Sequence, residues 1–307
     1  MDRCNVPLID RTCCTGCGAC IDVCPDRILA FDSLGRPKID GECCMLCGHC
    51  AALCPEVAII VPGLVNALSL TVIDERGPAN GRATVAPSEL VSLMRWRRSC
   101  RRFTTDPVTI DMLGDLVKIG TTAPSGTNSQ GWGFIILPRR ADVVRLGQVT
   151  AEFYCRLNKM AANPWYRVGS RLFAGGGLDS YYRRYYQTIE EALREWREEG
   201  VDRLFHGAPA AIIVTGDTAA SCPAEDALLA SQNILLAAES FGLGTCLIGF
   251  VVEAARRDRS IGRLLRLGVN ERIHAVIACG HPAVKFRRPA GRKPVEPRIL
   301  MIDGEDP

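Results

Sequence analysis

From residue 88 onward, apolar residues recur with the periods of helices and strands. A helix is predicted over residues 110–120, where Gly120 can end it, because its apolar positions follow a helical spacing: Met112, Leu113, Leu116, Val117 and Ile119. Another helix is expected to start near Ser88, which can cap it after Pro87. The apolar side of this helix carries Leu90, Val91, Leu93 and Met94.

Short apolar runs predict the strands of a sheet. They cover residues 134–137, where we expect a buried strand, and residues 208–217 and 273–280. Residues 222–245 predict a long helix with Pro223 and two acidic residues in its first turn and Gly242 at its C-terminal end. Its apolar residues fall nearly all round, so it should be buried in the domain centre or in a subunit interface.

The first 60 residues follow a different pattern, in which a cysteine-dense segment occurs twice. "CCTGCGACIDVCP" spans residues 13–25, and "CCMLCGHCAALCP" spans residues 43–55. Both contain the C-x2-C-x2-C-x3-C-P spacing of bacterial two-cluster ferredoxins, in which the fourth cysteine binds the other cluster. The spacing predicts two [4Fe–4S] clusters, one held by Cys14, Cys17, Cys20 and Cys54, the other by Cys44, Cys47, Cys50 and Cys24. Gly16, Gly18 and Gly48 suit loops that pass close to inorganic sulfur.

Other cysteine chemistries fit this repeat less well. Structural zinc usually takes two separated cysteine pairs, or cysteine with histidine. The sequence CGHC at residues 47–50 resembles a dithiol redox motif but lacks a preceding strand, and Ala51 stands where haem attachment needs histidine. Cys13 and Cys43 come one residue too early to be ligands, so we interpret them as packing residues. A segment this short builds little core, so the clusters are expected to supply part of its folding energy.

Composition narrows the class of protein. The 307 residues carry a net charge of +3, which is too small to indicate nucleic acid or an anionic membrane as a partner. The sequence contains no run of eighteen apolar residues and no apolar N-terminal segment, so no transmembrane helix or secretory signal is expected. We therefore expect a cytoplasmic protein whose sixteen cysteines serve metal or redox chemistry rather than disulfides.

Turn-forming residues separate two domains. Residues 61–87 are rich in them and predict a linker packed along the larger domain: Gly77, Pro78, Asn80, Gly81 and Pro87. The predicted organisation is a ferredoxin-like domain over residues 1–60, a linker over 61–87 and a larger domain over 88–307.

Four stretches of the larger domain carry candidate binding chemistry: "RRSCRRF" (97–103), "APSGTNSQGW" (123–132), "GLGTCLIGF" (242–250) and "CGHPAVKFRRPAGRKP" (279–294). Four arginines within residues 97–102 repel one another, so this stretch indicates a phosphate site; a solvated basic loop is the alternative. The glycine-rich stretch follows a helix rather than a strand, which argues against a Rossmann site. In this order, the four stretches resemble the flavin-dependent nitroreductase family.

The resemblance implies an α+β fold with a central, mainly antiparallel sheet flanked by helices, in a homodimer that binds FMN at its interface. By resemblance, the FMN phosphate and ribityl chain are held by Arg97, Arg98, Ser99 and Arg101, and Arg292 and Lys293 complete the phosphate site. The residues that reach the flavin of the other subunit are Pro124, Ser125 and Asn128. Those that line the isoalloxazine ring, with backbone amides near N5, are Leu247, Ile248 and Gly249.

Residues 152–206 resemble the family least. A Gly-rich bend precedes a predicted helix dense in Tyr and Arg, which is either a lid over the substrate pocket or an amphipathic surface helix. No residue is predicted as a catalytic acid, and His206 and His274 are interpreted as structural. The cysteines outside the repeat are interpreted as buried small hydrophobes: Cys100, Cys155, Cys222, Cys246 and Cys279.

Joining one-electron clusters to a flavin predicts an oxidoreductase. The clusters would reduce FMN, and FMN would then reduce an organic acceptor by two electrons. The resemblance implies a nitroaromatic, quinone or activated alkene as acceptor, and a low-potential donor such as ferredoxin is expected to supply electrons. Two alternatives stay open: a non-enzymatic redox sensor or electron carrier with FMN as relay to a partner protein, and a flavin enzyme that runs oxidatively.

Overall fold

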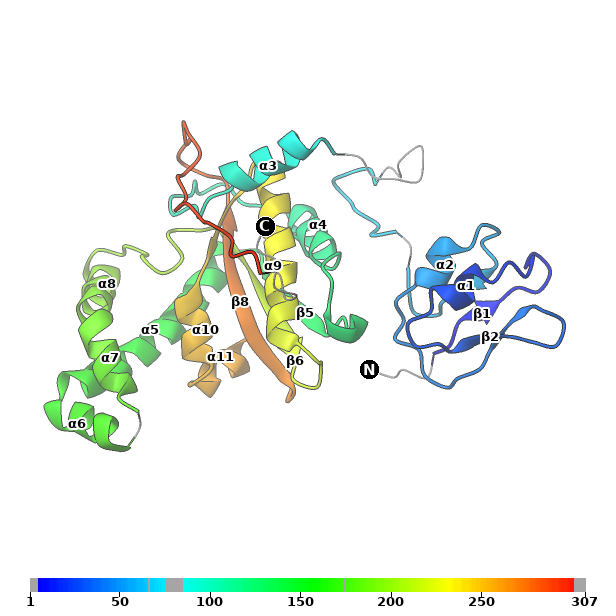
Figure 1. The fold of residues 1–307 in the computed structure, drawn as a ribbon. Coiled ribbons are helices and arrows are strands. Elements are labelled where there is room, and N and C mark those ends of the chain that lie inside the picture. The colour runs from blue at the N-terminus through cyan, green and yellow to red at the C-terminus, as the bar shows by residue number, and fades with distance from the viewer. Residues whose placement is uncertain (1–4, 66, 76–84, 174, 301–307) are drawn as a thin grey trace.

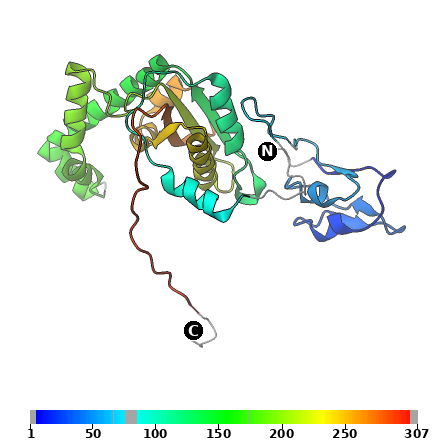
Figure 2. The same cartoon turned by 90° about the horizontal axis from the view of Figure 1, so that it is seen from above.

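The computed structural model describes residues 5–65, 67–75, 85–173 and 175–300. Figure 1 shows a small cysteine-rich domain at one side of a larger domain built around a sheet. Viewed from above, Figure 2 again places the small domain and the helices α6–α8 on opposite sides of that sheet. Over the described residues, no helix combines the length and hydropathy needed to span a membrane.

The small domain consists of two similar halves. Its elements are β1 (Leu8–Ile9), α1 (Ala19–Asp22), β2 (Leu29–Phe31), β3 (Pro37–Ile39), α2 (His49–Leu53) and β4 (Ile59–Ile60). β1 pairs with β4, and β2 pairs with β3, both antiparallel. Each helix follows a glycine in the left-handed region, Gly18 at φ 78° and Gly48 at φ 72°, which a residue with a Cβ adopts only with strain.

An antiparallel sheet forms the centre of the larger domain. Among the described residues it contains four strands in the order β5-β6-β8-β7: β5 (Trp132–Leu137), β6 (Ala210–Asp217), β8 (Glu271–Gly280) and β7 (Gly244–Leu247). Every neighbouring pair runs antiparallel. This arrangement confirms the expected α+β class with an antiparallel sheet.

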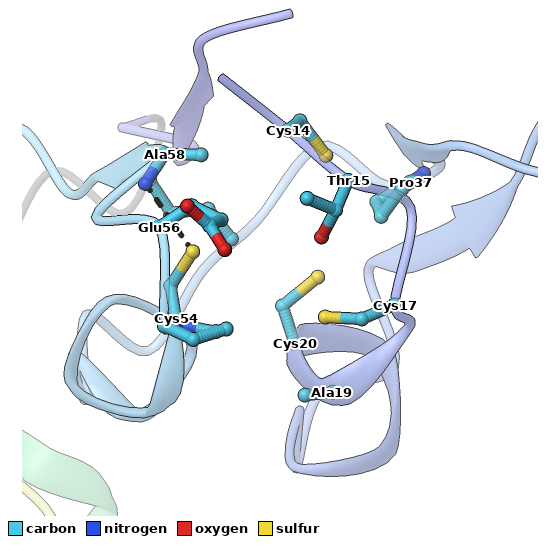
Figure 3. A pocket seen from close by; sticks show the side chains of 11 residues that line it. Cys14, Thr15, Cys17, Ala19, Cys20, Pro37, Cys54, Glu56 and Ala58 are labelled. Atoms are coloured by element: carbon cyan, nitrogen blue, oxygen red, sulfur yellow. Dashed lines mark hydrogen bonds between the residues drawn. The ribbon is translucent and has the colours of Figure 1, made fainter.

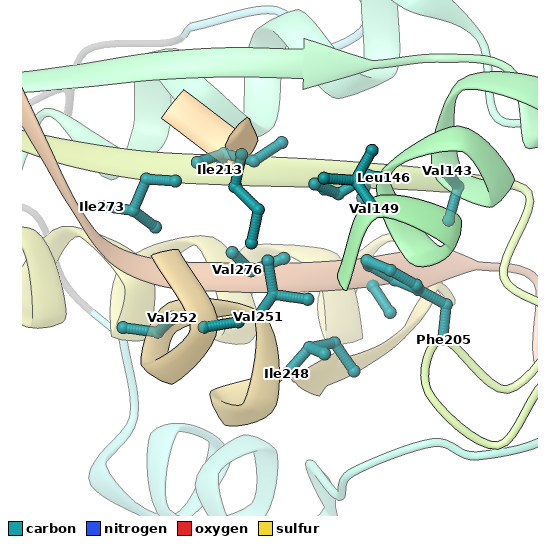
Figure 4. Packing of buried hydrophobic residues seen from close by; sticks show 14 of the residues in the cluster. Val143, Leu146, Val149, Phe205, Ile213, Ile248, Val251, Val252, Ile273 and Val276 are labelled. Carbon is teal, nitrogen blue, oxygen red and sulfur yellow. The ribbon is translucent and has the colours of Figure 1, made fainter. Parts of the chain in front are cut away.

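Helices cover both faces of this sheet. They are α3 (Pro87–Trp96), α4 (Ile110–Gly120), α5 (Arg140–Ala162), α6 (Pro164–Phe173), α7 (Gly177–Arg184), α8 (Tyr186–Glu198), α9 (Pro223–Ser240), α10 (Gly249–Ala255) and α11 (Arg259–Leu264), with the 3-10 turn η1 (Gly126–Asn128) before β5. Side chains of β6 alternate between the faces. Ile212 packs with α4 and α9, whereas Ile213 packs with α5, α10 and α11 in the cluster drawn in Figure 4.

Two expectations about the elements need correction, and a third stays open. The first helix starts at Pro87 with Ala86 as its N-cap, so Ser88 lies within the first turn and does not cap it, because proline is already suited to that position. The run 134–137 lies in β5 at the sheet edge, where its residues are half-buried rather than buried. In the single chain α9 is buried along one side, and its Leu228 and Leu229 are 51% and 45% exposed, so its expected burial in a subunit interface stays a prediction.

The stretch predicted as one Tyr- and Arg-rich helix forms two helices. α7 and α8 are separated at Tyr185, whose φ of −129° is not helical. Asn158 of α5 binds both helices. It accepts a hydrogen bond from the Tyr181 hydroxyl of α7 (2.5 Å) and donates one to Glu190 of α8 (2.8 Å). Ile189 and Leu193 are buried beneath α8, so α7 and α8 are packed against the domain.

A buried carboxylate fastens the linker to α4. Asp115 is fully buried and accepts hydrogen bonds from the backbone N–H groups of Thr71 (2.8 Å) and Val72 (2.6 Å). Lys118 lies 3.5 Å from the same carboxylate and also donates to the Ser69 carbonyl. Sequence analysis missed Asp115, because a single acidic residue in an amphipathic helix gives no distinguishing signal. The linker glycines and prolines over 76–84 lie outside the described residues.

We expect Asp115→Asn to release residues 69–72 from α4 and to lower the free energy of unfolding by about 1–3 kcal/mol, because buried N–H groups lose a charged acceptor. Amide exchange of residues 69–72 should accelerate. Asp111→Asn, an exposed acid of the same helix, is the control and should leave that exchange unchanged. Equal protection of residues 69–72 in both variants would contradict the role given to Asp115.

The same carboxylate gives the linker contact a pH dependence. Burial acts to raise the pKa of Asp115, but the hydrogen bonds from Val72 and Thr71 and the charge of Lys118 outweigh it, so the pKa is lowered. A lowered folded-state pKa stabilises above the unfolded value near 4, and the contribution is lost as pH falls through the folded value. As the pH is lowered below about 4, the free energy of unfolding of Asp115→Asn should therefore decrease less steeply than that of the natural protein. Denaturant titrations at a series of pH values measure both slopes.

Candidate functional site

The cysteines of the first repeat line a cavity together with one cysteine of the second. Cys14, Cys17, Cys20 and Cys54 face this cavity, with Pro37 and Ile59 among its other walls. Figure 3 shows their sulfur atoms directed inward from two different loops. The Cys54 sulfur accepts a hydrogen bond from the N–H of Ala58 at 3.2 Å, an interaction that favours a negatively charged sulfur.

The remaining four cysteines of the pattern line a second cavity: Cys24, Cys44, Cys47 and Cys50. Here the N–H of Leu46 donates to the Cys44 sulfur at 3.3 Å. Each cavity thus takes three cysteines from one repeat and the last from the other, which is the crossed arrangement that the spacing predicts. The assignment of these thiols as cluster ligands remains our proposal.

The separation of the thiols suits a cube of iron and sulfur better than a single ion. Over the described residues, no three Cys, His, Asp or Glu side chains converge closely enough to share one metal ion. In a [4Fe–4S] cluster each cysteine binds a different iron, so the four sulfurs surround the cluster instead of meeting at a point. The donor set of each cavity, four cysteines, therefore fits a [4Fe–4S] cluster.

Burial affects the chemistry of these thiols. It raises the pKa of Cys50 to about 11 and also raises the pKa values of Cys20 and Cys44. Thiolates are the ligands of iron, so cluster assembly here must release protons. Cys13 and Cys43 are exposed, so our interpretation of them as packing residues is wrong.

The arginine-rich stretch is held in an extended conformation beside the sheet. Ser99 forms a parallel bridge with Thr245 of β7, and Phe103 forms an antiparallel bridge with Pro282 after β8. The N–H of Cys100 donates to the Thr245 carbonyl at 2.8 Å. Gly244 is needed here, because a Cβ would lie 2.7 Å from the Cys100 Cβ. The sheet end therefore fixes the positions of Ser99 and Arg101.

The four arginines of this stretch have different neighbours. The guanidinium of Arg98 lies 4.7 Å from the centre of the Phe286 ring. Burial raises the pKa of Glu239, and the charge of Arg97 partly opposes this, which places Arg97 toward that carboxyl. Among the described residues, no carboxylate lies within ion-pair distance of Arg97, Arg98, Arg101 or Arg102.

A cavity of about 980 Å³ lies next to Arg101. Its floor includes Cys246, Leu247, Ile248 and Gly249, the segment expected to line a flavin ring. The Ile248 N–H is donated to the Val276 carbonyl at 2.8 Å, so it is unavailable to a ligand, contrary to the expectation that its amide lies near N5. Gly249 is the first residue of α10, and the helix itself leaves that N–H without a partner.

Aromatic side chains from residues 152–206 form much of the cavity wall: Phe153, Tyr154, Tyr181 and Tyr185, with Phe250 from α10. The Tyr154 hydroxyl donates to the Phe250 carbonyl at 2.9 Å. His206 also lines this cavity, and burial together with Arg101 lowers its pKa, so it is neutral at pH 7. Sequence analysis offered residues 152–206 as a possible lid over the pocket, but it did not single out Arg203 or Tyr181 and interpreted His206 as structural, because no motif marks them.

The loop before β5 lies at the other end of the sheet. Asp226, buried in the first turn of α9, accepts hydrogen bonds from the Gly126 N–H (2.8 Å) and the Ser129 hydroxyl (3.0 Å). Gly126 has no room for a side chain, because a Cβ would lie 2.6 Å from the Ser221 hydroxyl. Pro124 is exposed, whereas Ser125 and Asn128 are half-buried.

The sheet register separates the two groups of predicted flavin residues. Leu247 pairs with Ile277, whereas Trp132 pairs with Gly216 and Gly216 with Arg272. Five residues of β8 and three strand spacings lie between these points, which makes them about 20 Å apart. A single chain therefore brings Ser99, Arg101 and Leu247–Gly249 together, but not with Pro124, Ser125 or Asn128. Arg292 and Lys293 are exposed on the tail after β8, away from regular structure.

Two family models match different parts of the chain. Residues 94–281 match the model of the nitroreductase family, and residues 7–29 match that of the 4Fe-4S binding domain. An iodotyrosine deiodinase from Thermotoga neapolitana is 24% identical over 197 residues, which cover 63% of this chain and 88% of that protein. An iodotyrosine deiodinase from Daphnia pulex is 30% identical over 60 residues, and the chain spans only 20% of its length.

A nitroreductase with bound FMN from Bacteroides fragilis has a solved structure that covers 70% of this chain and 98% of its own, at 19% identity and a TM-score of 0.49. The antiparallel domain, the arginine stretch and the cysteine-rich domain define a flavin-dependent oxidoreductase with an iron–sulfur domain. The chain belongs to the nitroreductase family.

The crossed assignment of the cysteines can be tested by single substitutions. We expect Cys54→Ser to remove the cluster of the first repeat and about half of the eight irons expected per chain, although Cys54 belongs to the second repeat. Cys13→Ser, which changes an exposed cysteine of the first repeat, is the control and should keep all of the iron. Iron and acid-labile sulfide analysis measures both, and equal iron content in the two variants would contradict the assignment.

Proposed function

We propose that the protein is an FMN-dependent reductase that passes electrons from two [4Fe–4S] clusters to FMN and then to a small aromatic acceptor. The observation that carries this proposal is the aromatic cavity of about 980 Å³ that borders Arg101 and Leu247–Gly249. An electron carrier that serves a partner protein needs no such cavity. The alternative of a redox relay is therefore the weaker one.

The residues at the sheet end suit FMN. The phosphate would lie among Arg97, Arg98 and Arg101, whose mutual repulsion a dianion would relieve. The Ser99 hydroxyl and Arg101 guanidinium would orient it. Leu247, 46% exposed, offers an apolar surface to a planar ring. Bound here, FMN would supply the two-electron chemistry, and the protein supplies position and electrostatics.

The cavity chemistry favours a planar acceptor with an electron-poor or anionic group. Tyr185 and Phe250 pack edge to face, with ring centres 6.1 Å apart, and offer flat apolar walls. Arg101 and Arg203 place positive charge on the same cavity, where it would stabilise negative charge that develops on the acceptor during reduction. Nitroaromatics and quinones match this description best. The named relatives also make an iodinated phenol worth including among the acceptors tested.

The proposed flavin site requires a homodimer. Trp132, where the loop of Ser125 and Asn128 enters the sheet, lies about 20 Å along and across the sheet from Leu247 of the same chain, so this loop and Leu247 would contact different rings. A second copy would supply them, as the family resemblance implies. The exposed leucines of α9, Leu228 and Leu229, are available for such an interface.

Anaerobic stopped-flow spectroscopy tests the proposed electron path. Clusters reduced by dithionite should pass electrons to FMN, seen as bleaching of the flavin band, and the band should return when a nitroaromatic or quinone is added. Bleaching that no small acceptor reverses would favour the relay alternative. A flavin band that never responds to the reduced clusters would refute the proposal.

We expect Arg101→Ala to weaken FMN binding by about 10- to 100-fold, because a charge-assisted hydrogen bond to the phosphate contributes about 1.5–3 kcal/mol. Arg102→Ala removes an exposed arginine of the same stretch and should bind FMN almost as well as the natural protein. Fluorescence titration of FMN into the apoprotein gives both dissociation constants. Similar constants for the two variants would show that Arg101 does not hold the flavin.

A further inference from the structure

Within the described part of the chain, the side chain of Asn128 joins the small domain to the larger one by hydrogen bonds, and its position has consequences for electron transfer. The Asn128 side-chain amide donates hydrogen bonds to the backbone carbonyls of Leu46 (2.7 Å) and Met45 (3.2 Å). These two residues lie between Cys44 and Cys47, within the loop around the second cysteine cavity. The contact therefore joins one particular cluster loop to the loop before β5.

The cluster side of this contact is rigidly held. The Met45 N–H donates to the Asp26 carboxylate at 2.7 Å, and the Leu46 N–H donates to the Cys44 sulfur at 3.3 Å. Leu46 has a φ of 54°, which is uncommon for a leucine. Both N–H groups are thus directed into the small domain, and both carbonyls are directed out toward Asn128.

The loop before β5, on the other side of the contact, is also held in a defined conformation. Thr127, Asn128 and Gln130 have φ values of 51°, 49° and 46°, and such left-handed residues persist only where the surroundings impose them. The surroundings here are the buried Asp226, which holds Gly126 and Ser129, and the Ser125 hydroxyl, which accepts from the Gln130 N–H at 3.0 Å. This strained loop presents the Asn128 amide to the cluster loop.

The contact lies far from the flavin-binding elements of its own chain. Trp132, at the end of the loop before β5, and Leu247 are about 20 Å apart across the sheet, and Figures 1 and 2 both show the small domain and the helices α6–α8 on opposite sides of the sheet. In the homodimer of the proposed function, however, the same loop reaches the flavin held by the other copy. The cluster loop and the partner's flavin then meet at one place.

We propose that each ferredoxin domain delivers electrons to the FMN held by its partner subunit, and that the cluster of Cys24, Cys44, Cys47 and Cys50 is the exit cluster. The proposal rests on the proposed function and its dimer. Each reduced cluster gives up one electron, so two such transfers and one proton from water convert FMN to its reduced anion. An external low-potential one-electron donor, of the ferredoxin or flavodoxin class, reduces the clusters again.

Two features make the docked position favourable despite the few contacts. The linker is tied to α4 by Asp115, so the small domain stays near its docking site and binds it within one molecule. Asn128 uses its amide hydrogens for the cluster loop and keeps its amide oxygen for a ligand on the other side. One side chain can therefore lie between the exit cluster and the flavin.

Mixed dimers separate transfer between subunits from transfer within one chain. One protomer carries Cys44→Ser and Cys47→Ser, which remove the exit cluster, and the other carries Arg97→Ala and Arg101→Ala, which remove the flavin. Our proposal predicts that this crossed dimer still shows cluster-to-flavin electron transfer, measured as bleaching of the flavin band in single-turnover stopped flow. Transfer within one chain would leave its flavin oxidised.

The converse dimer gives the opposite prediction. Here one protomer carries all four substitutions and its partner is natural, so the single flavin faces a ferredoxin domain without an exit cluster. We expect no rapid bleaching in this dimer. Rapid bleaching here and none in the crossed dimer would overturn the inference while leaving the proposed function intact. Absence of bleaching in the natural homodimer would instead refute the proposed function.

The contact itself is tested without altering a ligand. Asn128→Ala should slow cluster-to-flavin transfer about tenfold, because two hydrogen bonds of the docked state are lost, while iron content stays unchanged. Amide exchange of residues 44–48 should rise at the same time. Gln148→Ala removes a surface amide of α5 that bonds Arg145 and serves as control. Equal transfer rates and equal exchange in both variants would contradict the docking role of Asn128.

Discussion

Two hydrogen bonds from the amide of Asn128 to the carbonyls of Leu46 and Met45 decide how the two halves of this protein meet. Hydrogen bonds of this kind contribute about 1 kcal/mol each, too little to hold separate domains together. They suffice here because Asp115 fastens the linker to α4 and keeps the small domain close by. Because the linker is short and the contacts are weak, the small domain has a defined docked position from which it can dissociate and to which it can return.

The antiparallel sheet sets the second constraint. Its register puts the arginine stretch and Leu247 at one end of the sheet and the loop before β5 at the other. In the proposed function each chain thus contributes to two different sites, which a second copy would complete. The strained φ values of Thr127, Asn128 and Gln130 occur in the loop where these sites would join, and Asp226 supports them from within α9. Strain of this kind is expected where a surface must fit a ligand on one side and a protein on the other.

Much of this arrangement could be predicted from the sequence, for physical reasons that differ between the parts. The crossed cysteine cavities follow from ligand spacing alone, since a C-x2-C-x2-C-x3-C-P loop can wrap one cube and reach the next. The helix over residues 110–120 and the antiparallel strands follow from hydrophobic period. The exposed position of Cys13, the edge position of β5 and the use of the Ile248 amide by the sheet were not predicted, because each depends on which tertiary neighbour is present. Asp115 and Asn128 each bind segments that are distant in the sequence, so no local sequence pattern predicts these contacts.

The most direct test of the account is a crystal structure of the dimer grown anaerobically with FMN and both clusters bound. The account predicts that the cluster held by Cys24, Cys44, Cys47 and Cys50 lies closer to the flavin bound by the partner subunit than to that bound by its own chain. It also predicts Asn128 between that cluster and that flavin. A structure in which each cluster domain lies nearest the flavin of its own chain would contradict the account.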